Sequence, residues 1–433
     1  MTRRDFAKTA ALAGLAGATS ALSAERIIGA KERVRLGFIG VGGRGTYLLG
    51  VALGFDGVEV PAVCDIDAAH LDRAVSLVEK SRGKRPAGYS SGPTDYRRLL
   101  ARDDLNAVAI ATPMQVHAAM AVDALNAKKH VLSEVSAATT MDECWALVRA
   151  AEASGRVYML AENCCYYRQN LAVLRMVRQG LFGDRTYAEC GYVHDCRDYV
   201  FEGDGRLTWR GELVRDHVGN LYPTHALGPV CQWLGINRGD RLVSLVASTS
   251  AGKGLERFVS KKFPADHPAR KIKFAVGDTT TTLIRTAKGA VIDLRYDTVS
   301  ARPHPSTTYY TLQGTTASYK DDGTQQQIWI EGRSKAYAWE PLAGYASEFE
   351  HPLWQKSGAK ASQTGHSGAD YFVMEQFVET VRTGRPAPID VYDAAAWSCI
   401  MPLSAASIRA GGAPQEIPDF TRGAWEKRSP VGL

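Results

Sequence analysis

The chain lacks long apolar runs, blocks of like charge and cysteine pairs with metal-binding spacing. After the N-terminus, no segment is long and apolar enough for a membrane helix, so no integral membrane segment is expected. The net charge of +6 over 433 residues comes without clustered Lys and Arg or interleaved aromatics, so no nucleic-acid partner is expected. The eight cysteines include no CxxC pair, so no metal site is expected from them.

The remaining composition is that of an ordinary globular protein, with 45% hydrophobic and 23% charged residues. This length predicts two or three domains. At the N-terminus, the pair Arg3-Arg4 precedes a short apolar run, Ala10–Ala18, and a small-residue stretch that ends near Ala24. This order is typical of a secretory signal, and the paired arginines resemble the twin-arginine export motif. We therefore expect residues 1–24 to be a signal peptide, and the mature protein to be periplasmic or secreted.

Between residues 33 and 165, short apolar runs alternate with helical patterns. This alternation predicts a parallel sheet with right-handed crossovers, the α/β architecture of a Rossmann domain. The Gly/Pro/Ser-rich segment 82–93 is expected to be a loop. The expected strands are Val34–Ile39, Val58–Val63, Ala107–Ala111, His130–Leu132 and Val157–Ala161.

The pattern changes after about residue 165. Runs rich in Thr, Tyr, Val and Ile, separated by turns, predict a large open and mainly antiparallel sheet. Helical patterns at 170–179 and 370–411 complete an α+β domain over residues 166–433. The expected strands are Arg185–Val193, Leu242–Ser248, Asp278–Thr286, Ala290–Tyr296, Tyr309–Gly314 and Gln327–Glu331.

A glycine motif follows the first expected strand and opens a helix. In it, Gly40 allows a tight turn, Gly42 lets the backbone approach a pyrophosphate, and Gly45 lets helix and strand pack closely. Asp65 follows about twenty residues later, where an acid binds the ribose 2′-hydroxyl and repels a 2′-phosphate. NAD is therefore favoured over NADP, although Arg44 could serve either a 2′-phosphate or the pyrophosphate.

Three further segments follow expected strands at the edge where ligands of such sheets bind. They are Thr112–His117, Glu134–Ser136 and Glu162-Asn163. Each could equally be a connecting loop with capping residues.

Met114-Gln115-Val116-His117 after Thr-Pro, the acid Glu134 and the two-domain layout together resemble the Gfo/Idh/MocA oxidoreductases. Many dehydrogenases of that family carry Glu-Lys-Pro where this chain has Glu134-Val135-Ser136. Several motifs resemble glycoside hydrolase family 109 more closely, a family typified by NAD-using α-N-acetylgalactosaminidases. They include Glu134–Ser136, Met141–Trp145, Glu162–Tyr166, Gly191–Asp195, Leu221–His225, Asp390–Asp393 and Ile417–Phe420.

The family 109 resemblance implies contacts to both cofactor and sugar. Carried over by position, the NAD contacts are Gly43, Arg44, Asp65, Met114, Gln115, Val116, His117, Glu134, Val135 and Asn163. The sugar contacts are Tyr192, Arg210, Tyr222, Pro223, Thr224, His225 and His304. His304 stands where the family has a Tyr, so the ring is kept but the identity of the glycoside is left open.

The resemblance also implies a mechanism in place of the usual pair of carboxylates. Transient oxidation at the sugar C3 acidifies the C2 proton, the C1 leaving group is eliminated, water adds, and the hydride returns from NADH. His225 would take the C3 hydroxyl proton. Tyr166 is the candidate base at C2, and Tyr222 positions hydroxyls. Alternatively, Tyr166 is a buried core residue and His225 a structural one.

Two other functions stay open. A sugar or polyol dehydrogenase would accumulate NADH with its substrate, and the valine at Val135 argues against it. A non-catalytic sugar-binding or partner-binding protein would keep NAD only for structure. In each case the expected ligand is a small molecule or glycan, and an open antiparallel sheet often pairs with a second copy of the chain.

Overall fold

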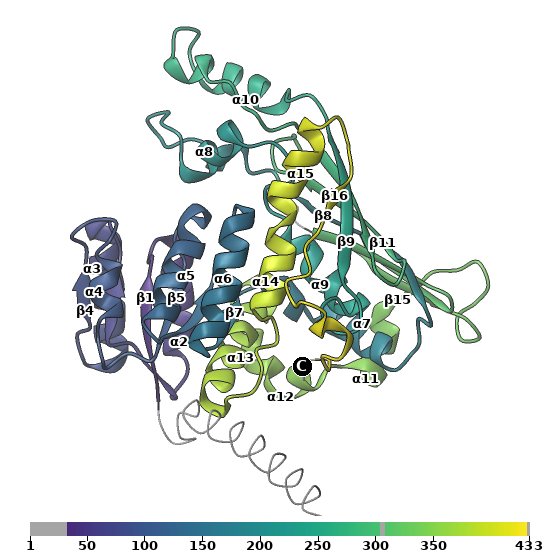
Figure 1. The fold of residues 1–433 in the computed structure, drawn as a ribbon, viewed down its shortest axis with the longest axis horizontal. Helices are drawn as coiled ribbons and strands as arrows, with labels where there is room; N and C mark the ends of the chain where they lie inside the picture. Colours follow the sequence, from purple (N-terminus) through teal and green to yellow (C-terminus); the bar gives the residue numbers. More distant parts are fainter. Residues whose placement is uncertain (1–32, 304–307, 431–433) are drawn as a thin grey trace, which may run out of the picture.

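The computed structural model describes residues 33–303 and 308–430, which form two sheets with helices packed around and between them (Figure 1). The expected signal peptide, residues 1–24, and His304 lie outside the described residues. No helix in the described ranges is both long enough and apolar enough to span a membrane. All eight cysteines are described, buried and unbridged.

The first sheet is parallel throughout and has the buried strand β1 near its centre, as the sequence predicts. The strand order is β4-β3-β1-β5-β6-β7, with β2 also paired to β1. The strands are β1 (Val34–Ile39), β2 (Val58–Glu59), β3 (Ala62–Cys64), β4 (Ala87–Tyr89), β5 (Ala107–Ile110), β6 (His130–Ser133) and β7 (Tyr158–Leu160).

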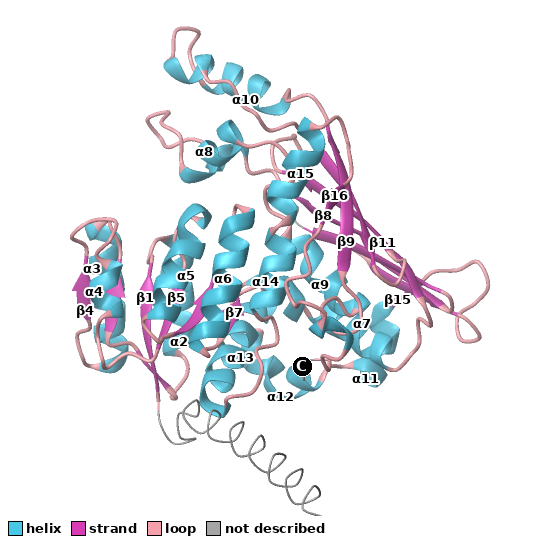
Figure 2. Ribbon diagram, in the orientation of Figure 1, coloured by secondary structure: helices cyan, strands magenta, loops and turns pink. Residues whose placement is uncertain are grey.

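Helices connect these strands, and their ends match capping signals in the sequence (Figure 2). Asp67 caps α3 by accepting from the backbone N–H groups of Ala69 and His70. Thr140 and Glu143 form a capping box at the start of α6. The helices are α2 (Gly43–Leu53), α3 (Ala68–Arg82), α4 (Tyr96–Leu100), α5 (His117–Asn126) and α6 (Met141–Ser154).

Two predictions for this domain need correction. The strand expected at Val58–Val63 is two strands, because Pro61 has no N–H to donate to a sheet. The partners along β1 shift at the same point: Val34 pairs with Val58, whereas Phe38 pairs with Val63. The segment 82–93, expected to be a loop, contains β4, an edge strand that needs a partner on one side only.

The second sheet is mainly antiparallel, as predicted, with a parallel pair formed by β8 and β11. Its order is β15-β14-β13-β12-β8-β11-β10-β9-β16. The prediction missed β13, which alternates buried and half-buried residues beside β12. The strands are β8 (Arg185–Val193), β9 (Leu242–Thr249), β10 (Thr280–Thr286), β11 (Val291–Asp297), β12 (Thr308–Gly314), β13 (Ala317–Asp321), β14 (Gln326–Ile330), β15 (Glu340–Pro341) and β16 (Gln415–Glu416).

Helices of the C-terminal half join the two sheets. α14 packs on α6 and β7, α15 packs on β9, and α13 packs on α2 (Figure 1). The residues before α14 also pair with the first sheet, since Leu160 N–H donates to the Ile389 carbonyl over 3.1 Å. The α-helices of this half are α7 (Arg168–Arg178), α8 (Trp209–Asp216), α9 (Thr224–Leu234), α10 (Gly254–Lys262), α11 (Ala346–Phe349), α12 (Pro352–Ala361), α13 (Ala369–Thr383), α14 (Val391–Ser398) and α15 (Ile400–Arg409).

Short 3₁₀ turns lie at several element junctions of the chain. Two of them, η1 (Met114–Val116) and η2 (Asn163–Tyr166), follow β5 and β7 at the carboxyl edge of the first sheet. The others are η3 (Arg197–Tyr199), η4 (Pro268–Lys271), η5 (Leu342–Tyr345), η6 (His366–Gly368) and η7 (Ala424–Glu426).

Candidate active site

The glycine motif forms a tight turn from β1 into α2. Gly40 has a φ of 81°, and a Cβ there would lie 2.8 Å from backbone atoms of Ala111. A Cβ on Gly45 would lie 1.9 Å from the carbonyl oxygen of Gly40. Both positions therefore require glycine for packing.

Gly42 and Gly43, by contrast, leave room for a Cβ without a clash. The nearest atoms to a Cβ on Gly42 belong to His70, 3.7 Å away, and a Cβ on Gly43 would meet nothing within 4 Å. Gly42 caps α2 without a side-chain hydrogen bond, so the first N–H groups of this eleven-residue helix are left to a ligand or solvent. A cradle of this shape at a helix N-terminus suits a pyrophosphate.

Asp65 lies at the end of β3, beside this turn. Its carboxylate accepts from the N–H of Val41 over 2.7 Å and from the N–H of Asp67 over 2.9 Å. The side chain is thus fixed against the glycine turn, where the sequence predicts the ribose acid.

Arg44 does not lie free for a phosphate. Its Nε donates to Glu134 over 2.7 Å, and its two terminal nitrogens donate to Asp370 over 2.9 and 2.7 Å. Burial lowers the pKa of Arg44, but the carboxylates of Glu134 and Asp370 raise it by more. The pKa of Arg44 therefore lies above its ordinary value. A role in holding a 2′-phosphate is therefore disfavoured, and the preference for NAD is strengthened.

Asp370 is the centre of a polar cluster that sequence reasoning missed. Its carboxylate is completely buried and also accepts from Asn163 over 3.1 Å and from His366 over 2.6 Å. Burial alone raises its pKa, but the hydrogen bonds from His366 and Arg44 hold the pKa well below its ordinary value. The residue comes from α13, 326 residues after Arg44, so no local motif indicates the pairing.

Side chains of the segment Met114–His117 form hydrogen bonds to neighbouring loops and to the second domain. Met114 is buried, while Val116 is exposed. The side-chain amide of Gln115 donates to the carbonyl of Trp209 in the second domain over 3.1 Å. The ring nitrogens of His117 lie 2.8 and 2.9 Å from the carbonyl oxygens of Thr112 and Ser136. The His117 side chain therefore holds two loops together and does not face a ligand.

Glu134 and Val135 lie where the cofactor edge meets the substrate domain. Val135 is buried, and its carbonyl accepts from the Tyr222 hydroxyl over 3.3 Å. A backbone oxygen of the first domain thus orients a predicted sugar-binding side chain of the second.

Three predicted sugar-binding side chains form one ring cluster. The centroids of Tyr192, Tyr222 and His225 lie 5.1 to 5.4 Å apart in pairs. The Arg210 guanidinium lies over the Tyr222 ring, 5.4 Å from its centroid. Arg210 and Tyr222 also line a small cavity together with Tyr296 and Thr298. Aromatic faces beside a cation suit the apolar faces and hydroxyls of a sugar.

Pro223 and Thr224 act through the backbone. Pro223 is the N-cap residue of α9, and Thr224, its first residue, is completely buried. These two residues place His225 in the first turn of α9, while their own side chains stay in the packing.

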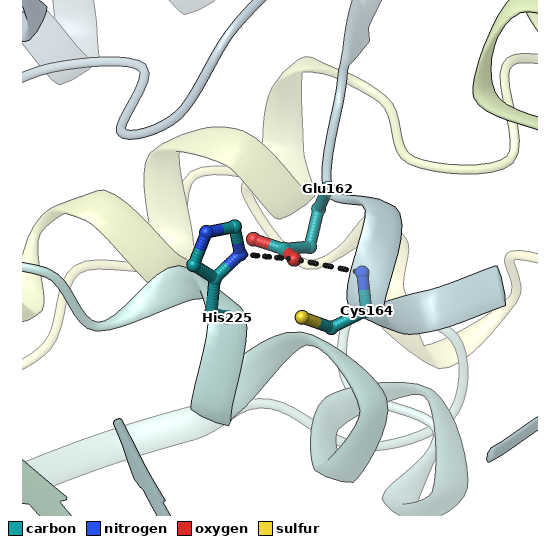
Figure 3. Close-up of side chains that lie close together, drawn as sticks. All are labelled: Glu162, Cys164 and His225. Atoms are coloured by element: carbon teal, nitrogen blue, oxygen red, sulfur yellow. Dashed lines mark hydrogen bonds and ion pairs between the residues drawn. The ribbon is translucent and has the colours of Figure 1, made fainter. Parts of the chain in front are cut away.

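His225 is paired with a buried acid. Its Nδ1 lies 2.7 Å from Oε1 of Glu162, whose side chain is completely buried (Figure 3). The same oxygen accepts from the N–H of Cys164 over 3.1 Å. Burial opposes the imidazolium, but Glu162 and Cys164 outweigh it, so the pKa of His225 lies well above its ordinary value.

Glu162, Cys164 and His225 also each offer an atom that could bind a metal, all within 4.8 Å of one another. Two ligands of a tetrahedral zinc ion, each about 2.1 Å from it, lie about 3.4 Å apart. The 2.7 Å between Nδ1 and Oε1 is instead a hydrogen-bond distance. The arrangement therefore fits a Glu–His pair.

The prediction that Tyr166 is the base at C2 is corrected. Tyr166 is completely buried, and its hydroxyl has no hydrogen-bond partner in the described part of the chain. Burial raises its pKa well above the ordinary value, and the cation that acts on it is Arg385, beyond α13. Tyr166 is thus a core residue, the alternative considered from the sequence.

These features fit a bound dinucleotide. The backbone at Gly42 and Gly43 leaves room for a pyrophosphate, and Asp65 is held beside this turn, where the sequence predicts the ribose acid. Glu134 and Asn163 lie at the same edge, joined through Arg44 and Asp370.

Comparisons with known proteins agree with this geometry. Residues 34–162 match the oxidoreductase family with an NAD-binding Rossmann fold, and residues 166–427 match the C-terminal domain of glycosyl hydrolase 109. The chain is 36% identical to an α-N-acetylgalactosaminidase of Tannerella forsythia, over 99% of both chains. It is 40% identical to a glycosyl hydrolase family 109 protein of Solibacter usitatus, also over 99% of both.

Solved structures share the fold at lower identity. An NAD-binding oxidoreductase from Klebsiella pneumoniae is 18% identical, with a TM-score of 0.69, over 89% of this chain and 99% of that one. A levoglucosan dehydrogenase in complex with NADH is 19% identical, with a TM-score of 0.67, over 90% and 100%. Since the family 109 relatives match nearly the whole length at much higher identity, this NAD-binding chain is a member of glycoside hydrolase family 109.

Proposed function

We propose that this NAD-dependent glycosidase cleaves α-N-acetylgalactosaminides while its cofactor stays bound, and that it does so after export by the twin-arginine route. The observation that carries the proposal is the pairing of His225 with Glu162. His225 belongs to the predicted sugar pocket, and Glu162 follows β7, the last strand along the chain in the first sheet, as the N-cap of η2. A proton-accepting group therefore lies where a sugar would meet the nicotinamide.

The proposed reaction requires the pocket residues to hold the sugar ring and to accept one hydroxyl proton. The chemistry that a bound NAD would supply is reversible hydride transfer to and from a sugar carbinol. At a pH above its raised pKa, His225 would receive the proton of the C3 hydroxyl at its second ring nitrogen, while the aromatic faces of Tyr192 and Tyr222 would hold the sugar ring. Arg210 supplies a hydrogen-bonding cation at the edge of the same pocket. The residue that takes the C2 proton is not Tyr166.

The alternative is a sugar or polyol dehydrogenase, as the solved structures with the same fold are named. Such enzymes release reduced cofactor in every turnover. The buried side chain of Val135, where many of them carry a lysine, offers no proton relay. A recycled cofactor also suits an exported enzyme, because no supply of NAD is needed outside the cytoplasm.

The decisive experiment uses purified protein, aryl α-N-acetylgalactosaminide and deuterated water. The proposal predicts free aryl alcohol, deuterium at C2 of the product and no net accumulation of NADH. NADH accumulation without release of the aryl alcohol would establish the dehydrogenase. A product without deuterium at C2 would rule out elimination, and bound NAD with no turnover on a panel of glycosides of both anomers would favour a binding protein.

Export is tested separately by fractionation. The full chain, expressed in a host with a twin-arginine system, is expected in the periplasm with NAD bound. Replacing Arg3-Arg4 by two lysines should keep it in the cytoplasm. Equal amounts of both forms in the periplasm would contradict the export proposal and leave the enzymatic one unaffected.

A further inference from the structure

We infer that Glu162 is a positioning residue: its carboxylate fixes the tautomer of His225, so that Nδ1 carries the proton and Nε2 is the atom that accepts one. The inference rests on the proposed function for the role of His225 as base. The Nδ1–Oε1 contact itself is independent of that function.

The geometry allows one hydrogen-bonding pattern. An ionised carboxylate has no proton to donate, so the nitrogen 2.7 Å from Oε1 of Glu162 must be the donor. Nε2 points away from Glu162 (Figure 3). In the neutral ring, Nε2 then keeps its lone pair, as a base acting on a hydroxyl requires.

Glu162 is itself held in place. Its Oε1 atom also accepts from the backbone N–H of Cys164, which anchors the carboxylate at the start of η2. On the other side, the His225 carbonyl accepts from the Tyr310 hydroxyl over 2.7 Å. The Oε1 atom of Glu162 and the backbone of His225 are therefore held by neighbours on different elements, while the other carboxylate oxygen, Oε2, is buried without a hydrogen-bond partner in the described part of the chain.

The groups around the His225 ring determine the pH above which Nε2 carries no proton. Titratable side chains that contact His225 are Glu162, Cys164, Tyr192, Tyr222 and, at the His225 carbonyl, Tyr310; the Arg210 guanidinium lies over the Tyr222 ring. Burial opposes a charge on the His225 ring and Glu162 favours it, so the pKa of His225 lies above its ordinary value and Nε2 is free of a proton only above that pKa.

The test is Glu162→Gln. A glutamine amide in place of the carboxylate can donate to Nδ1, which stabilises the opposite tautomer with the proton on Nε2. In the Ser-His-Asp triad, the corresponding loss of the acid lowers turnover by about 10⁴-fold through the wrong tautomer. For Glu162→Gln we expect kcat to fall by about 10²-fold or more with KM little changed, as for loss of general-base action.

A second readout does not depend on activity. Long-range ¹H–¹⁵N spectra of the ¹⁵N-labelled holoenzyme, with His225 assigned through His225→Asn, report which ring nitrogen bears the proton. Wild type should show the Nδ1–H tautomer once the ring is neutral, and Glu162→Gln the Nε2–H tautomer. A neutral wild-type ring protonated on Nε2 would overturn the inference, even if the variant failed to fold.

Two further variants separate positioning from packing. Cys164→Ala keeps the N–H that binds Glu162 and removes only the thiol that, with Glu162, raises the pKa of His225, so it should keep the wild-type tautomer while the pKa of His225 falls. Glu162→Asp keeps the charge but is one methylene shorter, and should keep the Nδ1–H tautomer with an intermediate loss of kcat.

If Glu162→Gln lowered thermal stability but left tautomer and kcat unchanged, Glu162 would be merely structural. If wild type cleaved no glycoside, the proposed function would fail while the spectra still decided the tautomer.

Discussion

The guanidinium of Arg44 and the carboxylate of Asp370 form a two-pronged ion pair, with nitrogen–oxygen distances of 2.9 and 2.7 Å, although 326 residues separate them. Arg44 follows the glycine cradle, and Asp370 lies in the first turn of α13. The pair therefore ties the C-terminal half of the chain to the rim of the predicted cofactor site. Asn163, a predicted NAD contact, is bound to the same carboxylate.

This pair should help to retain NAD. In Asp370→Asn, Arg44 and Asn163 lose the acceptor that orients them, so bound NAD should be lost at least about tenfold faster during gel filtration. Because a completely buried partner is removed, stability should fall by about 3 kcal/mol. Urea unfolding and the NAD content of the eluted protein measure the two effects.

The matched control is Asp204→Asn, which breaks an ion pair with Arg206 in which both side chains are more than half exposed. Exposed pairs contribute little, so this variant should keep both its NAD and its stability. Equal NAD retention by Asp370→Asn and wild type would show that the Arg44–Asp370 pair has no part in holding the cofactor.

Asp370 should also make the protein sensitive to acid. Its pKa in the folded state lies well below its ordinary value, so the unfolded chain binds a proton at a higher pH than the folded one does. Its contribution is therefore complete above the unfolded pKa of about 3.9 and declines as the pH falls below it. Urea unfolding of wild type and Asp370→Asn should show a stability difference that is constant from about pH 7 to 5 and shrinks towards pH 3. A difference that grew as the pH fell would contradict this assignment.

Alanine substitutions at two glycines of the same turn, Gly45 and Gly43, should change the free energy of unfolding in opposite directions. A Cβ on Gly45 meets the Gly40 carbonyl, so Gly45→Ala should cost about 3 kcal/mol in unfolding free energy and disrupt the turn. A Cβ on Gly43 meets no protein atom within 4 Å. Because alanine is the better helix former, Gly43→Ala should stabilise the cofactor-free protein by up to about 1 kcal/mol.

Gly43→Ala should nevertheless weaken NAD binding, since its methyl group enters the space predicted for the pyrophosphate. Unfolding of the NAD-free protein and calorimetric titration with NAD separate the two effects. Unchanged affinity for NAD in Gly43→Ala would place the pyrophosphate elsewhere.

The sequence predicts local features of this protein better than long-range ones. The prediction of strands from runs rich in Thr, Tyr, Val and Ile matches β8, Arg185–Val193, residue for residue, because this preference for strands is local. The glycine motif likewise predicts the turn at Gly40, because its requirement for a small residue is local. Contacts between distant segments carry no such pattern. Asp370 is one acid in a helical stretch, and Glu162 and His225 are 63 positions apart.

Tyr166 shows the limit of reasoning from position alone. It follows Glu162 by four residues and lies at the edge where ligands of such a sheet bind. The short turn η2, however, directs Glu162 towards His225 and buries Tyr166 in the core. A side chain at a ligand-binding edge can point towards the ligand or away from it, and the packing of α13 on η2 decides which.

Tyr166→Phe is the direct test of this correction. The hydroxyl is buried without a partner, so its removal should leave kcat/KM on an aryl glycoside within about twofold of wild type. Because an unsatisfied buried hydroxyl costs about 1 to 3 kcal/mol, the variant should be as stable as wild type or more so in urea unfolding. Tyr222→Phe, which loses a hydroxyl bound to the Val135 carbonyl, is the comparison and should lower kcat/KM. A loss of kcat of more than about 10²-fold in Tyr166→Phe, with stability unchanged, would contradict the correction and show that Tyr166 acts as a general acid or base.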